Sequence, residues 1–329
     1  MVGTFKANNP LNAFLLFIYG LLLKFSFFRN VHLPVVQKSD GIFFRELILW
    51  LNKAGTGWPV IYPLLTYLLL FTQAVTFNKL LNNQRLIQRS THLPAMSYLL
   101  ITSLFPEWNM LTSTLIINTL MIWVWSKINT LYNSSNPKTV LFNIGIMIGI
   151  CSFFYLPSLV FAIIILFALV LTRPFNLAEW IIGLVGVITP FYLFFVWLFL
   201  SDKLNYYKLP AFTVAYPRFQ QQYWSLAGIA LILVAFLTGG YFAQINFNRQ
   251  VVQVRNSWSL ILFYLVVSVL VPFINYTHTF EYWILTAVPL SAFIACAFFY
   301  PSKRWFPLSL HWLMVALIIT AGYFIRYLV

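Results

Sequence analysis

The chain has 329 residues, of which 61% are hydrophobic and only 8% are charged, and its formal net charge is +14. A water-soluble domain carries about 25% charged residues, so this composition excludes an ordinary soluble globular protein. The basic residues stand singly between apolar runs, which argues against a nucleic-acid-binding surface and is typical of membrane loops that face anionic head groups.

The apolar runs have the length of membrane-spanning helices, about 17–25 residues for a hydrocarbon layer of about 30 Å. In hydrocarbon every backbone N–H and C=O must be paired, which a helix achieves within one segment. We expect spans at 11–28, 58–78, 90–105, 109–127, 139–155, 157–172, 178–200, 223–245, 257–274, 280–299 and 305–327. The predicted fold is all-α, a polytopic transmembrane bundle of about eleven spans that forms one integral membrane domain over residues 1–329.

The first long loop, 29–57, follows the first span and contains an amphipathic segment from Gly41 to Ala54. With about 14 residues this segment is too short to span, so we expect an interfacial helix there. Asp40 stands directly before it. Two interpretations remain open: an N-cap of this helix, or a catalytic carboxylate held at the membrane surface.

Lys and Arg in the short loops predict a cytoplasmic N-terminus and a periplasmic C-terminus. This orientation places five of the six acidic residues on the outer side, namely Asp40, Glu46, Glu107, Asp202 and Glu281. If the protein carries out acid–base or metal chemistry, we therefore expect that chemistry at the outer face. Equally open is the interpretation that outer turns simply tolerate acids.

The second outer loop, 202–222, combines cations with aromatic side chains. Cations suit a pyrophosphate or phospholipid head group, and aromatic faces suit sugars. The candidate substrate-binding residues are Lys203, Tyr206, Tyr207, Lys208 and Arg218. The alternative is that these are ordinary interfacial tyrosines and snorkelling lysines.

A third outer element, NYTHTFEYW, carries His278 and Glu281 at the start of the tenth span. A spacing of three residues places them on one side of a helical turn, so the pair is a candidate for substrate binding or proton relay. Two ligands do not make a metal site, although a divalent metal stays open as a cofactor. The alternative role for Glu281 is an acid at a helix start, where it interacts with the helix dipole.

The chain resembles an uncharacterised family of inner-membrane proteins found in Bacteroidota. The stretches that carry this resemblance are FKANNPLNAFLLFIYGLLLK, THLPAMSYLLITSLFPEW, FNIGIMIGICSFFYLPSL and TRPFNLAEWIIGLVGVITPFY. The resemblance covers most of the chain and implies a location in the cell inner membrane, without an activity.

More loosely, the chain is similar to GT-C glycosyltransferases. Those enzymes place a catalytic acid and interfacial helices in the outer loop after the first span. The resemblance implies a polyprenyl-phosphate-linked sugar as substrate, membrane lipid as surroundings, and Asp40 as the acid, with Glu46 or Glu107 as partner. The sequence departs from the pattern because Gly41, rather than a second acid, follows Asp40.

Three functions follow as alternatives. The first is a GT-C-like glycosyltransferase of envelope glycan assembly. The second is a non-catalytic membrane component of an envelope or secretion assembly, and the third is a transporter or flippase. The near absence of acids at mid-bilayer depth in spans 2 to 10 argues against an ion-driven transporter.

Overall fold

The structure is a computed structural model that describes residues 2–29, 31, 33–54, 58–204, 223–247, 249–275 and 280–328. Within these residues the secondary structure is helical, and the one β-type contact is an isolated antiparallel bridge between Asp40 and Tyr155. The expected fold class, an all-α protein, is confirmed for this part of the chain.

Fourteen α-helices follow one another along the described residues. They are α1 (Val2–Lys6), α2 (Leu11–Leu23), α3 (Phe25–Arg29), α4 (Ile42–Ala54), α5 (Ile61–Asn83), α6 (Leu93–Leu104), α7 (Ser113–Thr130), α8 (Pro137–Phe154), α9 (Ala162–Thr172), α10 (Leu177–Leu200), α11 (Tyr223–Phe247), α12 (Val252–Leu270), α13 (Ala287–Phe299) and α14 (Trp305–Leu328). Short 3-10 helices connect several of them: η1 (Pro106–Asn109), η2 (Leu131–Asn133), η3 (Leu156–Phe161), η5 (Val271–Phe273) and η6 (Glu281–Thr286).

Seven of the described helices are long and apolar enough to cross a membrane, which makes the chain a multi-pass membrane protein. They are α5, α8, α10, α11, α12 with η5, η6 with α13, and α14. Three further apolar segments, Leu11–Leu23, Leu93–Leu104 and Leu156–Thr172, are shorter. Each predicted span coincides with helical structure, but the count of eleven crossings stays a prediction.

The first expected span, 11–28, is divided at Lys24 into α2 and α3. Lys24 has φ −99° and ψ 7°, outside helical geometry, and its backbone N–H closes the last turn of α2. The division brings the Lys24 side chain into the protein interior, where it is only 2% exposed. Lys24 is therefore an interior residue and does not extend to the membrane surface, although it stands near the end of an apolar run.

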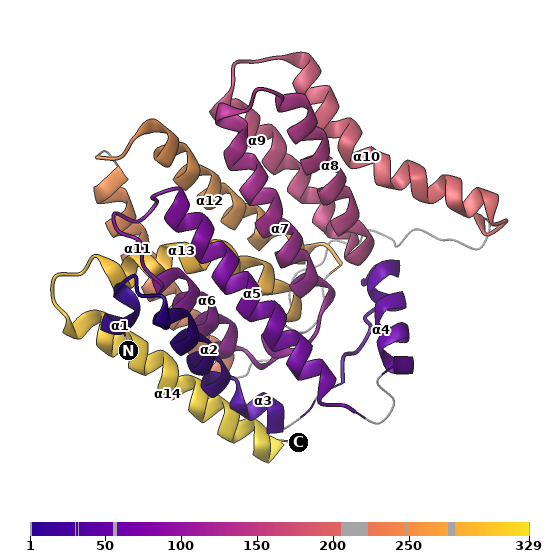
Figure 1. The fold of residues 1–329 in the computed structure, drawn as a ribbon. Coiled ribbons are helices and arrows are strands. Elements are labelled where there is room, and N and C mark those ends of the chain that lie inside the picture. The colour runs from indigo at the N-terminus through magenta and orange to yellow at the C-terminus, as the bar shows by residue number, and fades with distance from the viewer. Residues whose placement is uncertain are drawn as a thin grey trace.

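The centre of the bundle is formed by α6 and α13, which pack against each other. Every residue of α6 is buried, and so is every residue of α13 except Leu290. The other helices surround this pair, and α10 lies at the periphery with its C-terminal half standing clear of the bundle (Figure 1). Buried central helices and exposed apolar outer helices are what a bundle solvated by lipid requires.

Glycines allow α8 and α10 to approach closely. A Cβ atom added to Gly145 would lie 2.4 Å from the carbonyl oxygen of Gly183, and one added to Gly149 would lie 2.6 Å from that of Val187. Gly145 and Gly149 form a G-x-x-x-G pattern, which is typical of helix–helix contacts in membranes. The contact fixes α8, whose C-terminal end carries the corner that holds Asp40.

The amphipathic helix predicted in the first long loop is present as α4, at the edge of the molecule beside α8 (Figure 1). Phe44, Ile48 and Leu51 are buried against the bundle, whereas Leu49 and Trp50 are exposed. An apolar surface directed away from the bundle agrees with a helix in the membrane interface, which stays a prediction.

Candidate functional site

Asp40 is held where the first long loop meets the corner between α8 and η3. The backbone N–H of Gly41 donates a 2.7 Å hydrogen bond to the carbonyl oxygen of Phe154, beside the bridge between Asp40 and Tyr155. Gly41 is required there, because an added Cβ would lie 2.0 Å from the carbonyl oxygen of Phe153. The loop is thus fixed at its closest approach to the bundle.

The carboxylate of Asp40 accepts hydrogen bonds from three separate segments. Its Oδ1 accepts from the hydroxyl of Ser113 at 2.5 Å and from the hydroxyl of Tyr282 at 3.2 Å. Its Oδ2 accepts from the backbone N–H of Gln37 at 2.9 Å. These contacts differ from those of an N-cap, which would accept from the first N–H groups of α4. Asp40 instead joins the loop to α7 and η6.

Burial raises the pKa of Asp40. The residue is 3% exposed, and burial raises its pKa above the ordinary value of 3.8. The hydrogen bonds from Ser113, Gln37 and Tyr282 and the charge of Arg45 act in the opposite direction and offset part of this effect. The result is a buried carboxyl group with an elevated pKa outside the expected spans.

Two tyrosines pack beside Asp40. The rings of Tyr155 and Tyr282 are stacked with centroids 4.4 Å apart. The hydroxyl of Tyr155 donates to the carbonyl oxygen of Ile274 at 2.9 Å, and the hydroxyls of Tyr282 and Ser39 lie 2.8 Å apart. Because each hydroxyl has a partner, both rings are fixed in orientation and limit the movement of the Asp40 carboxylate.

Glu107 lies in η1, between α6 and α7, and is partly buried. Burial raises the pKa of its carboxyl group above the ordinary value of 4.5. Its Oε2 atom is buried and accepts no hydrogen bond from the described residues. A buried carboxylate oxygen without a protein donor lacks the hydrogen bond that normally compensates for its loss of water.

Glu281, the first residue of η6, completes the site. The next residue, Tyr282, donates its hydroxyl hydrogen bond to Oδ1 of Asp40, so η6 lies against the loop that carries Asp40. The indole N–H of the neighbouring Trp108 donates a 2.8 Å hydrogen bond to the carbonyl oxygen of Phe280, which connects η1 to η6. We call Asp40, Glu107 and Glu281 the carboxylate cluster. Three acids from distant parts of the chain therefore lie on segments that contact one another at one end of the bundle.

The other predicted site residues are not part of this cluster. Glu46 is exposed on α4. Lys203 is also exposed, and its Nζ lies 5.9 Å from the ring centroid of Trp197. The remaining candidates, Tyr206, Tyr207, Lys208, Arg218 and His278, lie outside the described residues. Within the described part of the chain, no three His, Cys, Asp or Glu side chains are arranged to hold a metal ion.

An apolar cavity of about 390 Å³ lies between α11, α12 and α13, and none of the three acids lines it. Trp108, Phe280 and Trp283 line one part of it, next in sequence to Glu107 and Glu281. We call this cavity the apolar groove. Sequence reasoning missed it because its walls come from helices that are apolar throughout, and composition does not reveal where such helices separate.

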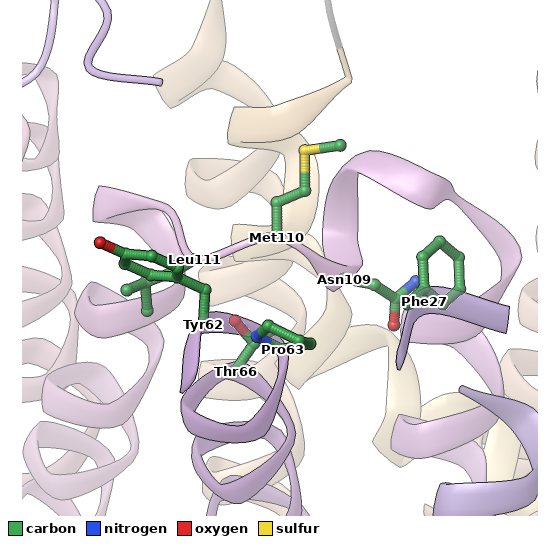
Figure 2. Close-up of a pocket in the computed structure, with 7 residues that line it drawn as sticks. All are labelled: Phe27, Tyr62, Pro63, Thr66, Asn109, Met110 and Leu111. Atoms are coloured by element: carbon green, nitrogen blue, oxygen red, sulfur yellow. The ribbon is translucent and has the colours of Figure 1, made fainter. Parts of the chain in front are cut away.

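The buried Lys24 defines a second polar centre. Its amino group donates to the hydroxyl of Thr102 at 3.1 Å and to the side-chain oxygen of Asn109. Asn109 also lines a small cavity between α3, α5 and the segment after η1 (Figure 2). Its volume of about 10 Å³ has room for one water molecule. Lys24 thus anchors η1, which carries Glu107.

A sequence model of a family of unknown function (DUF6427) matches residues 59–327. Glu107 and Glu281 lie within the matched region, whereas Asp40 precedes it. No curated protein and no solved structure matches the chain.

Proposed function

Because this chain belongs to a family of unknown function (DUF6427), we propose an activity from its own site: a GT-C-like glycosyltransferase of the cell inner membrane that acts on lipid-linked sugars in envelope glycan assembly. The observation that supports the proposal is the packing of the three acid-bearing segments at one end of the bundle, where Asp40 bonds to Ser113 and Tyr282 and where η1, which carries Glu107, is joined to η6, which carries Glu281. In the proposed topology of eleven spans with a cytoplasmic N-terminus, this end faces the periplasm.

In the proposed reaction Glu107 is the general base. Its unpartnered Oε2 accepts the proton of an acceptor hydroxyl, and the acceptor oxygen forms a bond to the anomeric carbon of the sugar. The bond between that carbon and the phosphate oxygen of the donor breaks, and the polyprenyl phosphate leaves with the electron pair. The proton then passes from Glu107 to water. A pKa raised by burial makes Glu107 a stronger base than an exposed glutamate.

Asp40 acts as a positioning residue in this scheme. Its carboxylate accepts three hydrogen bonds and is almost fully buried. It therefore holds Ser113 and Tyr282 in position rather than contacting substrate. The departing phosphate requires cations, and the proposal assigns them to the 202–222 loop, where Lys203, Lys208 and Arg218 stand in the sequence. Tyr206, Tyr207 and His278 are proposed to contact the sugar, with a divalent metal as an open addition.

One observation favours a second function, a non-catalytic component of an envelope or secretion assembly. The hydrogen bonds of Asp40 are those of a structural contact that joins a loop, α7 and η6. Under this alternative, Glu107 and Glu281 are helix-start acids without a chemical role.

The test is transfer by the purified full-length chain in proteoliposomes, supplied with a panel of radiolabelled polyprenyl-phosphate sugars and bacterial lipid extract. We expect lipid-extractable label to move from donor to a new product, and the Glu107→Gln variant to lose at least about 100-fold of the rate. The matched control is Asp202→Asn, an exposed acid at φ 52° where asparagine is tolerated. Equal rates for Glu107→Gln and the parent chain would refute the assignment of the base.

A further inference from the structure

A further cavity, of about 240 Å³, lies where α11 ends and α12 begins, and it shares no lining residue with the apolar groove. Gly240 and Phe247 line it from α11, and Trp258 and Leu262 line it from α12. A Cβ atom added to Gly240 would have nothing within 4 Å, which agrees with open space at this position. Leu262 is 47% exposed, so the cavity is accessible from the lipid side. We call it the α11–α12 cavity.

Unlike the apolar groove, this cavity has several hydrogen-bonding groups in its lining. Trp258 is only 5% exposed, and its buried indole N–H has no acceptor among the described residues. The amide of Gln244, which is exposed on α11, and the hydroxyl of Ser259 also line the cavity. Donors are costly to leave unpaired in apolar surroundings, so the lining suits a ligand that brings acceptor oxygens.

A cation without an acid lies next to the cavity. The guanidinium carbon of Arg255 is 6.0 Å from the ring centroid of Phe247, one of the lining residues. The buried Nε of Arg255 donates to no residue that the structure describes. Within the described part of the chain the one ion pair joins Arg173 to Glu179, so no carboxylate neutralises Arg255. A phosphate at this position would supply both the missing charge and the missing acceptor.

The depth of the cavity indicates which phosphate belongs there. Phe247 is the last residue of one membrane-length segment and Val252 is the first residue of the next, so Arg255 lies near the head-group level. Leu262 lies midway along its segment, at the level of hydrocarbon. A phospholipid has its phosphate and its acyl chains at these two levels, whereas a free phosphate offers nothing to the deeper part of the cavity.

We propose that the α11–α12 cavity binds an anionic phospholipid. The phosphate lies beside Arg255, the ester oxygens accept hydrogen bonds from Gln244 and Trp258, and one acyl chain continues along Gly240 and Leu262. In the proposed topology this is the cytoplasmic side, where the leaflet is negatively charged.

The site lies far from the proposed chemistry. Arg255 is near the beginning of α12, whereas Ile274, whose carbonyl oxygen accepts from Tyr155 beside Asp40, follows its other end. The lipid is therefore not a substrate of the proposed transfer but a bound component of the opposite end of the bundle.

The experiment uses two photoactivatable probes with identical diazirine-bearing acyl chains, phosphatidylglycerol and phosphatidylcholine, in phosphatidylcholine proteoliposomes of the full chain. After irradiation, mass spectrometry of peptides quantifies the label on residues 240–247 and 258–262. We expect phosphatidylglycerol to label them roughly fivefold more than phosphatidylcholine, the effect of one cation on an anionic head group. An excess of inorganic phosphate should leave this preference unchanged.

The charge is tested by Arg255→Gln, which should bring the two probes to equal labelling. The matched control is Lys303→Gln. Lys303 is an exposed cation that lines a separate cavity beside the same stretch of α11, together with Tyr241 and Phe242. Its loss should leave the preference for phosphatidylglycerol as it is in the parent chain.

The space is tested by Gly240→Leu, which fills the cavity from a position where a Cβ meets no neighbour. This variant should reduce labelling by the phosphatidylglycerol probe several-fold. Ile245→Leu introduces the same side chain at an exposed position of α11 that does not line the cavity, and it should keep the labelling of the parent chain.

Equal labelling by both probes in the parent chain would overturn the inference. So would a preference that Lys303→Gln abolishes as fully as Arg255→Gln, because it would report a general attraction to a basic surface. Competition by inorganic phosphate would assign the site to a free anion and reject the lipid. If Arg255→Gln folds poorly, Gly240→Leu decides, and labelling equal to that of Ile245→Leu refutes the site. None of these results depends on sugar transfer.

Discussion

Ser113 donates a 2.5 Å hydrogen bond to Oδ1 of Asp40 across 73 positions of the chain. Ser113 is the first residue of α7, and Asp40 lies in the loop that precedes α4. The bond therefore fixes the first long loop to α7, from which it is separated in the sequence by the helices α4, α5 and α6. The order of the carboxylate cluster depends on this contact.

The Ser113→Ala variant tests the contact. Removing a donor from a buried carboxylate costs about 1.5–3 kcal/mol, so the thermal unfolding midpoint in detergent should fall clearly. Ser309→Ala is the control, because the Ser309 hydroxyl donates to the carbonyl oxygen of Phe306 within its own helix. Equal midpoints for the two variants would contradict a stabilising role of the bond.

Stability should depend on pH through Asp40 and Glu107. Burial raises the pKa of both groups in the folded state, so the folded chain binds protons more tightly than the unfolded chain. The stabilisation is complete below the unfolded values near 4 and is lost as the pH rises through the raised folded values. Unfolding midpoints measured from pH 4 to pH 8 should therefore decrease.

The variant Glu107→Gln should flatten this decrease, since glutamine does not titrate. Asp202→Asn, an exposed acid, should leave the slope as it is in the parent chain. A midpoint that increases over the same pH interval would have the wrong sign and would exclude buried carboxyl groups with raised pKa values.

Gly41→Ala should disturb the site without touching a carboxylate. Its Cβ would lie 2.0 Å from a backbone oxygen, so the loop or the end of α8 must shift, at a cost of about 1–3 kcal/mol. Gly3→Ala is the control because nothing lies within 4 Å of its added Cβ. The GT-C pattern has a second acid after the first, whereas this chain has Gly41 after Asp40. The fold has no room for a side chain at position 41.

Gly239 and Gly240 are neighbours in α11 with opposite expected behaviour. A Cβ on Gly239 would lie 1.9 Å from the carbonyl oxygen of Phe293, whereas nothing lies within 4 Å of one on Gly240. Gly239→Ala should separate α11 from α13 and lower the unfolding midpoint. Gly240→Ala should keep or raise the unfolding midpoint. Alanine restricts the unfolded chain and can add about 0.4–1 kcal/mol to the free energy of unfolding. Similar midpoints for both would refute the close helix contact.

Cysteine labelling tests the proposed orientation. The two native cysteines, Cys151 and Cys296, are fully buried and should not react, so that only an introduced cysteine is labelled. A membrane-impermeant maleimide applied to intact cells should modify Glu46→Cys, on the proposed periplasmic side, and not Lys303→Cys, on the proposed cytoplasmic side. Both positions are exposed, and detergent permeabilisation should make both reactive. The reverse pattern would invert the topology and end the periplasmic assignment of the cluster.

The positions of the helices could be predicted from the sequence because each apolar run of membrane length must satisfy its own backbone hydrogen bonds. The break between α2 and α3 at Lys24 could not be predicted, although the sequence shows a lysine near the end of an apolar run. Hydrophobicity cannot distinguish a lysine that reaches the membrane surface from one that bonds to Thr102 and Asn109 inside.

For the site, the sequence indicated that Asp40, Glu107 and Glu281 share one side of the membrane, since loop charges constrain topology. It did not reveal Ser113 and Tyr282 as the partners of Asp40, because hydroxyl side chains in apolar runs carry no periodic signal. Glu46 is exposed because a different face of α4 packs against α8. The amphipathic pattern of residues 41–54 does not reveal which face of the helix makes that contact.

The hydrogen bond from Trp108 to the carbonyl oxygen of Phe280 has a consequence for motion. Because this bond joins η1 to η6, we expect the two short helices to move together. Glu107 and Glu281 would then keep their mutual spacing when the neighbouring helices shift.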